Sequence, residues 1–182
     1  MPEFSKKVIL LIGLIVGMNS VVFSQQGFTV GIGGTLETTN ELYGINARVF
    51  YAINEHFCFG PEASIFPFQE IDEAFEKSIV DLNINAHYIF EITHALGIYP
   101  LSGMNYTNEQ ERLIDNNDTS KKFQEIGLNY GFGAHYKINN MFLFAEFKGI
   151  IGQLSAEFIT AGVLFNLPKK NKKEHHNDTK TL

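Results

Sequence analysis

The feature that most constrains the fold of this chain is an alternation of apolar and polar residues, which holds almost throughout residues 27–167. A period of two places successive side chains on opposite faces of an extended strand, whereas an amphipathic helix needs a period near 3.6. Polar turns divide this region into eight predicted strands. These cover residues 27–36, 43–53, 57–66, 79–92, 96–106, 123–138, 141–150 and 157–167. The pattern predicts an all-β protein.

The predicted connections between the strands are alternately short and long. The short ones lie at residues 51–57, 90–96 and 136–142, and each has an aromatic residue, an isoleucine two positions later, a polar turn and an apolar restart. They predict three tight hairpins at one rim. The longer ones, at residues 67–78 and 107–122, are rich in Asn, Asp, Glu and Lys. We expect them as loops at the opposite rim of an antiparallel up-and-down β-barrel.

The two faces of these strands differ in chemistry. One face is nearly all apolar, and it includes Phe28, Val30, Ile32, Ile45, Val49, Leu82, Ile84, Ile126, Leu128, Phe132, Ile159 and Val163. The other face is polar but small, and it includes Thr29, Gly31, Asn46, Ser64, Asn83, Asn85, Gly131 and Asn129. A soluble barrel would place the apolar face inside and cover its outside with Lys and Glu, but the polar face lacks that cover. We therefore expect an eight-stranded transmembrane β-barrel with a polar lumen. The alternative is an inverted, soluble barrel.

Aromatic residues near the strand ends agree with the transmembrane interpretation, because such barrels carry aromatic girdles at both membrane interfaces. These residues are Tyr43, Tyr51, Tyr88, Tyr136 and Phe165.

Residues 1–24 have the pattern of a secretory signal peptide. Lys6 and Lys7 precede an apolar run at residues 8–16, which is shorter than the roughly 20 residues that a spanning helix needs. Small residues before Gln25 predict cleavage after Ser24. The alternative is an uncleaved membrane anchor.

Charge is unevenly distributed along the chain. The signal peptide contributes +1 and a basic tail at residues 168–182 contributes +3, which leaves −10 for residues 25–167 in a chain of net charge −6. Nucleic-acid binding needs a basic surface, so the acidic body excludes that class of function. The single cysteine, Cys58, excludes an intramolecular disulfide. We expect the tail to be disordered.

Charged residues also alternate onto the inward face, where the short turns set their register. The inward charges are Arg48, Glu62, Asp81, Glu146 and Lys148. A hairpin centred on Glu55 places Arg48 directly across from Glu62. A two-residue turn at Asn139 and Asn140 places Glu146 and Lys148 opposite glycines. Buried ions are tolerated only when they are paired, so we expect one network in the lumen. It either gates the lumen or only solvates a wet core.

No catalytic spacing is found in the sequence. A lipid-modifying enzyme would need a serine, a histidine and a carboxylate on the outer surface, but His87 and His135 are expected to point inward. His175 and His176 in the tail are too few ligands for a metal site. We therefore expect no enzyme activity, no metal and no cofactor.

Two prolines fall inside predicted strands. Pro61 and Pro100 cannot donate a backbone hydrogen bond, so each is expected to mark a bulge or a weak point in the barrel wall.

Taken together, residues 27–167 resemble the small outer-membrane barrels of OmpA and OmpX type. The resemblance rests on the expected cut after Ser24, the paired aromatic hairpins, and a last strand at 158–165 that alternates towards Phe165. In that family the aromatic usually ends the chain, whereas this chain continues into a basic tail. The resemblance implies a Gram-negative outer-membrane location, folding by the barrel-assembly machinery, contact with outer-membrane lipid and lipopolysaccharide, and a plugged lumen. Because both ends of an even-stranded barrel lie on its periplasmic side, we expect the basic tail in the periplasm.

Three classes of function remain open. The first is a structural or surface-interaction protein that meets an extracellular or periplasmic partner. Its interaction surface would be a polar loop at 108–118 and an acidic loop containing Glu70, Asp72, Glu73 and Glu76. The second is a narrow gated pore for small solutes or ions, which an eight-stranded lumen disfavours. The third is a lipid-modifying outer-membrane enzyme.

Overall fold

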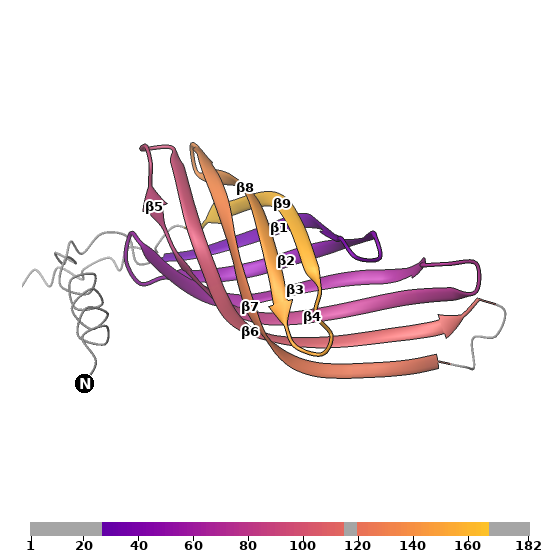
Figure 1. The fold of residues 1–182 in the computed structure, drawn as a ribbon. Coiled ribbons are helices and arrows are strands. Elements are labelled where there is room, and N and C mark those ends of the chain that lie inside the picture. The colour runs from indigo at the N-terminus through magenta and orange to yellow at the C-terminus, as the bar shows by residue number, and fades with distance from the viewer. Residues whose placement is uncertain (1–26, 115–119, 168–182) are drawn as a thin grey trace, which may run out of the picture.

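The computed structural model describes residues 27–114 and 120–167, and all of its regular structure is β-strand (Figure 1). The strands are β1 (Gly27–Glu37), β2 (Leu42–Ala52), β3 (Phe57–Glu70), β4 (Phe75–Tyr88), β5 (Phe90–Glu91), β6 (Leu96–Leu113), β7 (Ser120–Ile138), β8 (Met141–Ile151) and β9 (Glu157–Asn166). Within the part of the chain that the structure describes, no helix has the length and apolar character of a membrane span. The expected signal peptide and tail lie outside the described residues.

The strands close into one antiparallel barrel. Apart from β4 and β5, strands that follow one another in the sequence pair with each other, β1 pairs with β9, and β4 pairs with both β3 and β6. The short β5 pairs with β6 in the same register as β4, so β4 and β5 form one wall strand interrupted at Ile89. The wall therefore has eight strands, which confirms the predicted fold.

The wall is apolar outside and polar inside. Ile45, Ile84 and Phe132 point outward and are more than 60% exposed, although they are large hydrophobic side chains. Asn46 and Asn85 point inward and are 1% exposed. This is the reverse of a soluble protein, and it supports the transmembrane interpretation over the inverted barrel.

Three tight turns define one end of the barrel, here called the short-turn end. The Asn54 side chain accepts hydrogen bonds from two backbone N–H groups of its turn, and the Thr93 side chain does the same in the next. Asn139 adopts a positive φ of 54° in the two-residue turn that joins β7 to β8. The three predicted hairpins are confirmed.

The opposite end, here called the long-hairpin end, differs from the sequence prediction. We expected long loops at residues 67–78 and 107–122, but strands β3, β4, β6 and β7 continue through most of both segments. Only residues 71–74 separate β3 from β4. The four strands reach well beyond the rest of the barrel (Figure 1). Polar residues on both faces made these extensions look like loops, because a strand that leaves the membrane no longer needs an apolar face.

The two prolines act differently from the expectation of bulges. The β2–β3 pairing passes from Arg48–Glu62 to Tyr51–Phe59 in unchanged register, with no pair assigned at Pro61. Likewise Pro100 lies where the pairing of β6 passes from β4 to β5. Each proline interrupts a ladder without shifting it, because it lacks only the N–H group. The register shift instead lies between Phe66 and Gln69.

Candidate functional site

Ion pairs join the five inward charges in the middle of the lumen. The observed register places Arg48 opposite Glu62, Glu146 opposite Gly133 and Lys148 opposite Gly131, as the short turns predicted. Arg48 Nη2 lies 3.1 Å from Glu62 Oε2, and Arg48 Nη1 lies 2.9 Å from Glu146 Oε2. Lys148 Nζ lies 2.6 Å from Glu62 Oε1 and 3.7 Å from Asp81 Oδ2. All five side chains are at most 2% exposed.

Gly133, which lies opposite Glu146, makes room for an aromatic ring rather than for a charged side chain. A Cβ atom at Gly133 would lie 2.5 Å from the Tyr99 ring, so the space beside Glu146 is filled by that ring. The Tyr99 hydroxyl donates a hydrogen bond of 3.1 Å to Glu146. Sequence reasoning missed Tyr99, although its position in the alternation of β6 predicts an inward side chain.

Amide and hydroxyl side chains continue the network along the β4, β6 and β7 side of the lumen. Asn105 donates to Asp81 and Asn83, and Thr107 donates to Asp81 at 2.7 Å. Asn129 donates to Asn83 and Asn85. Thr107 lies in the segment 107–122 that the sequence predicts as a loop, but the structure places it on the inward face of β6. The pattern of Asn105 and Thr107, two residues apart, would have identified both.

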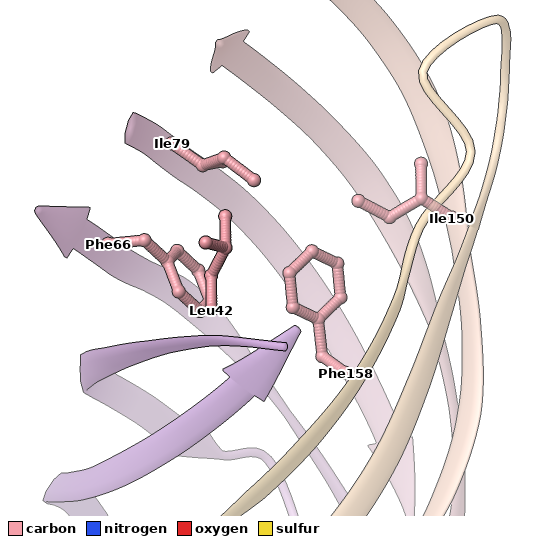
Figure 2. Close-up of a cluster of buried hydrophobic side chains, with 5 residues drawn as sticks. All are labelled: Leu42, Phe66, Ile79, Ile150 and Phe158. Carbon is pink, nitrogen blue, oxygen red and sulfur yellow. The ribbon is translucent and has the colours of Figure 1, made fainter. Parts of the chain in front are cut away.

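An apolar cluster closes the long-hairpin end of the lumen. Figure 2 shows its side chains, which converge from several strands and are at most 4% exposed. They are Leu42, Phe66, Ile79, Ile150 and Phe158. The lumen was expected to be polar throughout, so this seal is a difference from the sequence prediction. The apolar cluster lies next to the charged network, on its long-hairpin side, since Lys148 Nζ is 5.3 Å from the centre of the Phe158 ring.

The short-turn end of the lumen is not filled in this way. It holds a cavity of about 580 Å³, whose lining includes Arg48, His87, Tyr99 and the thiol-bearing Cys58. The mouth of the cavity lies among the short turns, since Asn54 and Thr93 also line it. The lumen therefore has a sealed end and an open end, with the ion pairs between them.

The four acidic residues predicted for a loop lie on the extended β3–β4 hairpin. Glu70 ends β3, Asp72 and Glu73 lie in the turn, and Glu76 belongs to β4. Asp72 accepts hydrogen bonds from two backbone N–H groups of the turn, and Glu76 is paired with Arg112 at 2.8 Å. The predicted polar loop at 108–118 is mostly strand as far as Leu113. Its residues 115–118 lie outside the described part.

Beyond the rest of the barrel, β3, β4, β6 and β7 form a projecting four-stranded sheet. Pairing of β3 with β4, β4 with β6 and β6 with β7 continues to the strand tips. In contrast, the pairing of β2 with β3 ends at Ile45–Ile65, and that of β7 with β8 ends at Leu128–Ile151. The projecting sheet therefore has two edges above the wall.

Side chains cap parts of both edges. On the β3 edge, the Gln69 amide accepts from Tyr43 N at 2.9 Å and donates to Tyr43 O at 2.8 Å. On the β7 edge, Glu125 accepts from the backbone of Gln153 and Leu154. Residues 120–124 of β7 have no strand partner on this side among the described residues.

The histidines, the cysteine and the carboxylates of the described residues form no metal-binding group. Across residues 27–114 and 120–167, no group of three or more His, Cys, Asp or Glu side chains could hold a metal ion. His87 is 4% exposed and stacks between Phe50 and Tyr99. His175 and His176 lie outside the described residues.

A closed antiparallel barrel with an apolar wall and a polar lumen is the architecture of an outer-membrane protein. The sequence model of the family described as "Outer membrane protein beta-barrel domain" matches residues 10–164. The chain belongs to this family, and its location is the cell outer membrane.

Solved structures of small barrels are similar to this one in fold. The N-terminal β-barrel domain of Pseudomonas aeruginosa OprF is 20% identical, with a TM-score of 0.60 over 79% of this chain and 98% of that chain. Neisserial surface protein A is 17% identical, with a TM-score of 0.60 over 78% and 97%. Ail of Yersinia pestis, in complex with the heparin analogue sucrose octasulfate, is 14% identical, with a TM-score of 0.55 over 78% and 97%. No curated protein matches the chain by sequence.

Proposed function

We propose that this protein acts at the cell surface as an interaction protein, in which a plugged barrel anchors the projecting sheet and presents it to a partner. The projecting sheet is the observation that carries the proposal. The membrane wall requires only about 9 to 11 residues in each strand, whereas β6 has 18 and β7 has 19. The additional length builds a surface that the barrel itself does not need.

The charge of the projecting sheet indicates the kind of partner. Its described carboxylates are Glu70, Asp72, Glu73, Glu76, Glu109, Glu111 and Glu125, and its described cations are Lys77, Arg112, Lys121 and Lys122. Lys77 is paired with Glu109 and Glu111, at 3.0 and 3.2 Å. The excess of negative charge favours a basic polypeptide segment. Ail was crystallised with a polyanion, so the two proteins would differ in ligand charge.

Binding to the purified protein in lipid nanodiscs tests this function. We expect a lysine-rich peptide to bind, and an alanine-rich peptide of equal length to bind more weakly. The triple variant Glu70→Gln, Asp72→Asn, Glu73→Gln should weaken that binding, because it removes charge from the tip. A matched control is Glu55→Gln in a short turn at the opposite end. The proposal would be contradicted if the triple variant and Glu55→Gln lost peptide binding equally, or if the two peptides bound equally well.

We infer that the lumen is plugged rather than conducting. The apolar seal and the paired charges support this interpretation, since together they obstruct the lumen from the long-hairpin end down to Arg48. Planar-bilayer recordings test it: we expect no stable single-channel steps from the wild-type protein. Such steps, and their enlargement in Arg48→Ala, would favour the gated pore instead.

We also infer that the protein is not an enzyme. Both strand histidines point into the lumen, away from the lipid in which a lipid-modifying site would lie. Mass spectrometry of lipid A from cells with and without the gene tests this inference, and any gene-dependent modification would overturn it. Contacts with lipopolysaccharide and with the assembly machinery remain predictions from the family.

A further inference from the structure

The open end of the lumen has the properties of a ligand site. Its cavity of about 580 Å³ falls in the size range of small-molecule sites, about 300 to 1,000 Å³. We propose that this cavity binds a small organic cation that carries an aromatic ring or a quaternary ammonium group, and that the cation enters from the short-turn end. This site is separate from the projecting sheet, so either proposal can fail without the other.

An aromatic belt forms the floor of the cavity. Five rings from β2, β4, β6, β7 and β8 follow one another around the lumen, in the order Phe50, His87, Tyr99, His135 and Phe142. Their neighbouring centroids are 4.4, 4.7, 5.9 and 5.2 Å apart. Aromatic faces carry partial negative charge and attract quaternary ammonium ions. The His87 and Tyr99 rings cover each other's faces, whereas the end rings Phe50 and Phe142 are tilted by 49° and 76° to the neighbouring histidines.

The centre of the belt is held by stacking. The His87 ring lies nearly parallel to the Tyr99 ring, with an interplanar angle of 7°. Its Nε2 atom is buried and has no hydrogen-bond partner among the described residues. Cys58, directly across from His87 on β3, adds a polarizable side chain to the lining. The floor of the cavity is thus aromatic and polarizable. Arg48 also lines the cavity, but it is already paired with carboxylates.

The charge around the cavity favours a cation over an anion. In the ion network above the floor, Glu62, Asp81 and Glu146 face only two cations, Arg48 and Lys148. At the mouth, the charged lining residues are Glu55, Glu91 and Lys137. Carboxylates exceed cations at both levels, and low-dielectric walls strengthen the resulting field inside the cavity.

The other end of the lumen offers no entrance to this site. The apolar cluster and the ion pairs both lie between the belt and the long-hairpin end, and their side chains are at most 4% exposed. A ligand therefore reaches the belt only through the mouth among the short turns.

Three probes of similar size and different charge test the proposal: benzyltrimethylammonium, benzyl alcohol and benzenesulfonate. The full mature chain in nanodiscs is titrated with each, and backbone amide resonances are followed by NMR. We expect the cation to give saturable shifts at Cys58 and Gly97, which line the cavity, and none at Gly152 near the opposite end. The neutral probe should bind about tenfold more weakly, and the anion more weakly still, since carboxylates outnumber cations around the cavity. Equal binding of the three probes, or no saturable shift with the cation, would overturn the proposal.

Variants of the belt separate cation binding from general hydrophobic binding. Phe142→Leu removes a ring but keeps an apolar side chain, and we expect the cation to bind about threefold more weakly. Phe90→Leu is the matched control, because Phe90 is 50% exposed on the lipid-facing side. Glu91→Gln, at the exposed mouth of the cavity, should weaken the binding of the cation but not the binding of benzyl alcohol. Unchanged cation binding in both Phe142→Leu and Glu91→Gln would contradict the assignment.

Discussion

The two ends of the lumen are built from the same strands and yet are packed differently. At the long-hairpin end, the inward side chains are large and apolar, and Phe66 and Phe158 are at most 1% exposed. At the short-turn end, the inward rings are spread around a cavity of about 580 Å³. The comparison teaches that alternation determines which side chains point inward, whereas their size and chemistry determine whether the lumen is closed there. One barrel can therefore combine a sealed end with an open one.

The largest expected effect concerns the ion pairs that divide the two ends. Arg48→Met leaves the buried Glu146 without its ion-pair partner and Glu62 with Lys148 alone, and we expect a loss of about 4 kcal/mol in the free energy of unfolding. Urea unfolding in lipid, followed by circular dichroism or by gel mobility of the folded form, measures it. Arg112→Met is the control, because the Arg112–Glu76 pair is partly exposed and should cost less than about 1 kcal/mol. If both variants lost a similar, small amount of unfolding free energy, the ion pairs in the lumen would not stabilise the barrel.

The second prediction compares packing at the two ends directly. Phe158→Ala removes a ring from the sealed cluster and should cost about 3 kcal/mol, because it leaves a new void. Phe142→Ala removes a ring that already borders open space and should cost about half as much. Urea unfolding of both variants under the same conditions measures the two losses of unfolding free energy. Equal costs would show that the cavity end is as tightly packed as the sealed end.

Thiol labelling tests which end is open. Cys58 lines the cavity, so in the wild-type protein a charged, water-soluble thiol reagent should modify it from the short-turn side. In a Cys58→Ser background, Leu42→Cys places the thiol in the sealed cluster, where we expect no modification in the folded protein from either side. Mass spectrometry gives the extent of labelling. Rapid labelling of residue 42 would show that the seal opens.

The smallest expected effect compares turns at the two ends. Asn139 and Glu41 both have a positive φ, of 54° and 56°, but asparagine tolerates this region better than glutamate does. Glu41→Gly should therefore stabilise the protein by up to about 1 kcal/mol, whereas Asn139→Gly should change its stability little. Thermal or urea unfolding measures both. Equal gains in the two variants would contradict this account of the turns.

Much of the wall and part of the lumen could be predicted from the sequence. Period two and three short turns were enough to place Arg48 opposite Glu62, because a tight turn leaves the register little freedom. The prediction of loops at residues 67–78 and 107–122 was wrong, because strands continue there beyond the lipid. The extensions of β3, β4, β6 and β7 carry polar residues on both faces, so alternation no longer marks them as strands.

The sequence by itself determined the class of fold, the inward and outward faces, and which charges enter the lumen, because each follows from local alternation and turn chemistry. Only the tertiary structure decided which inward side chains meet. Tyr99 reaches Glu146 from β6, and the aromatic belt assembles from five different strands. Those contacts depend on the closure of β4 onto β6 and on the width of the closed ring. The sealed end, the open cavity and the projecting sheet are consequences of that three-dimensional closure.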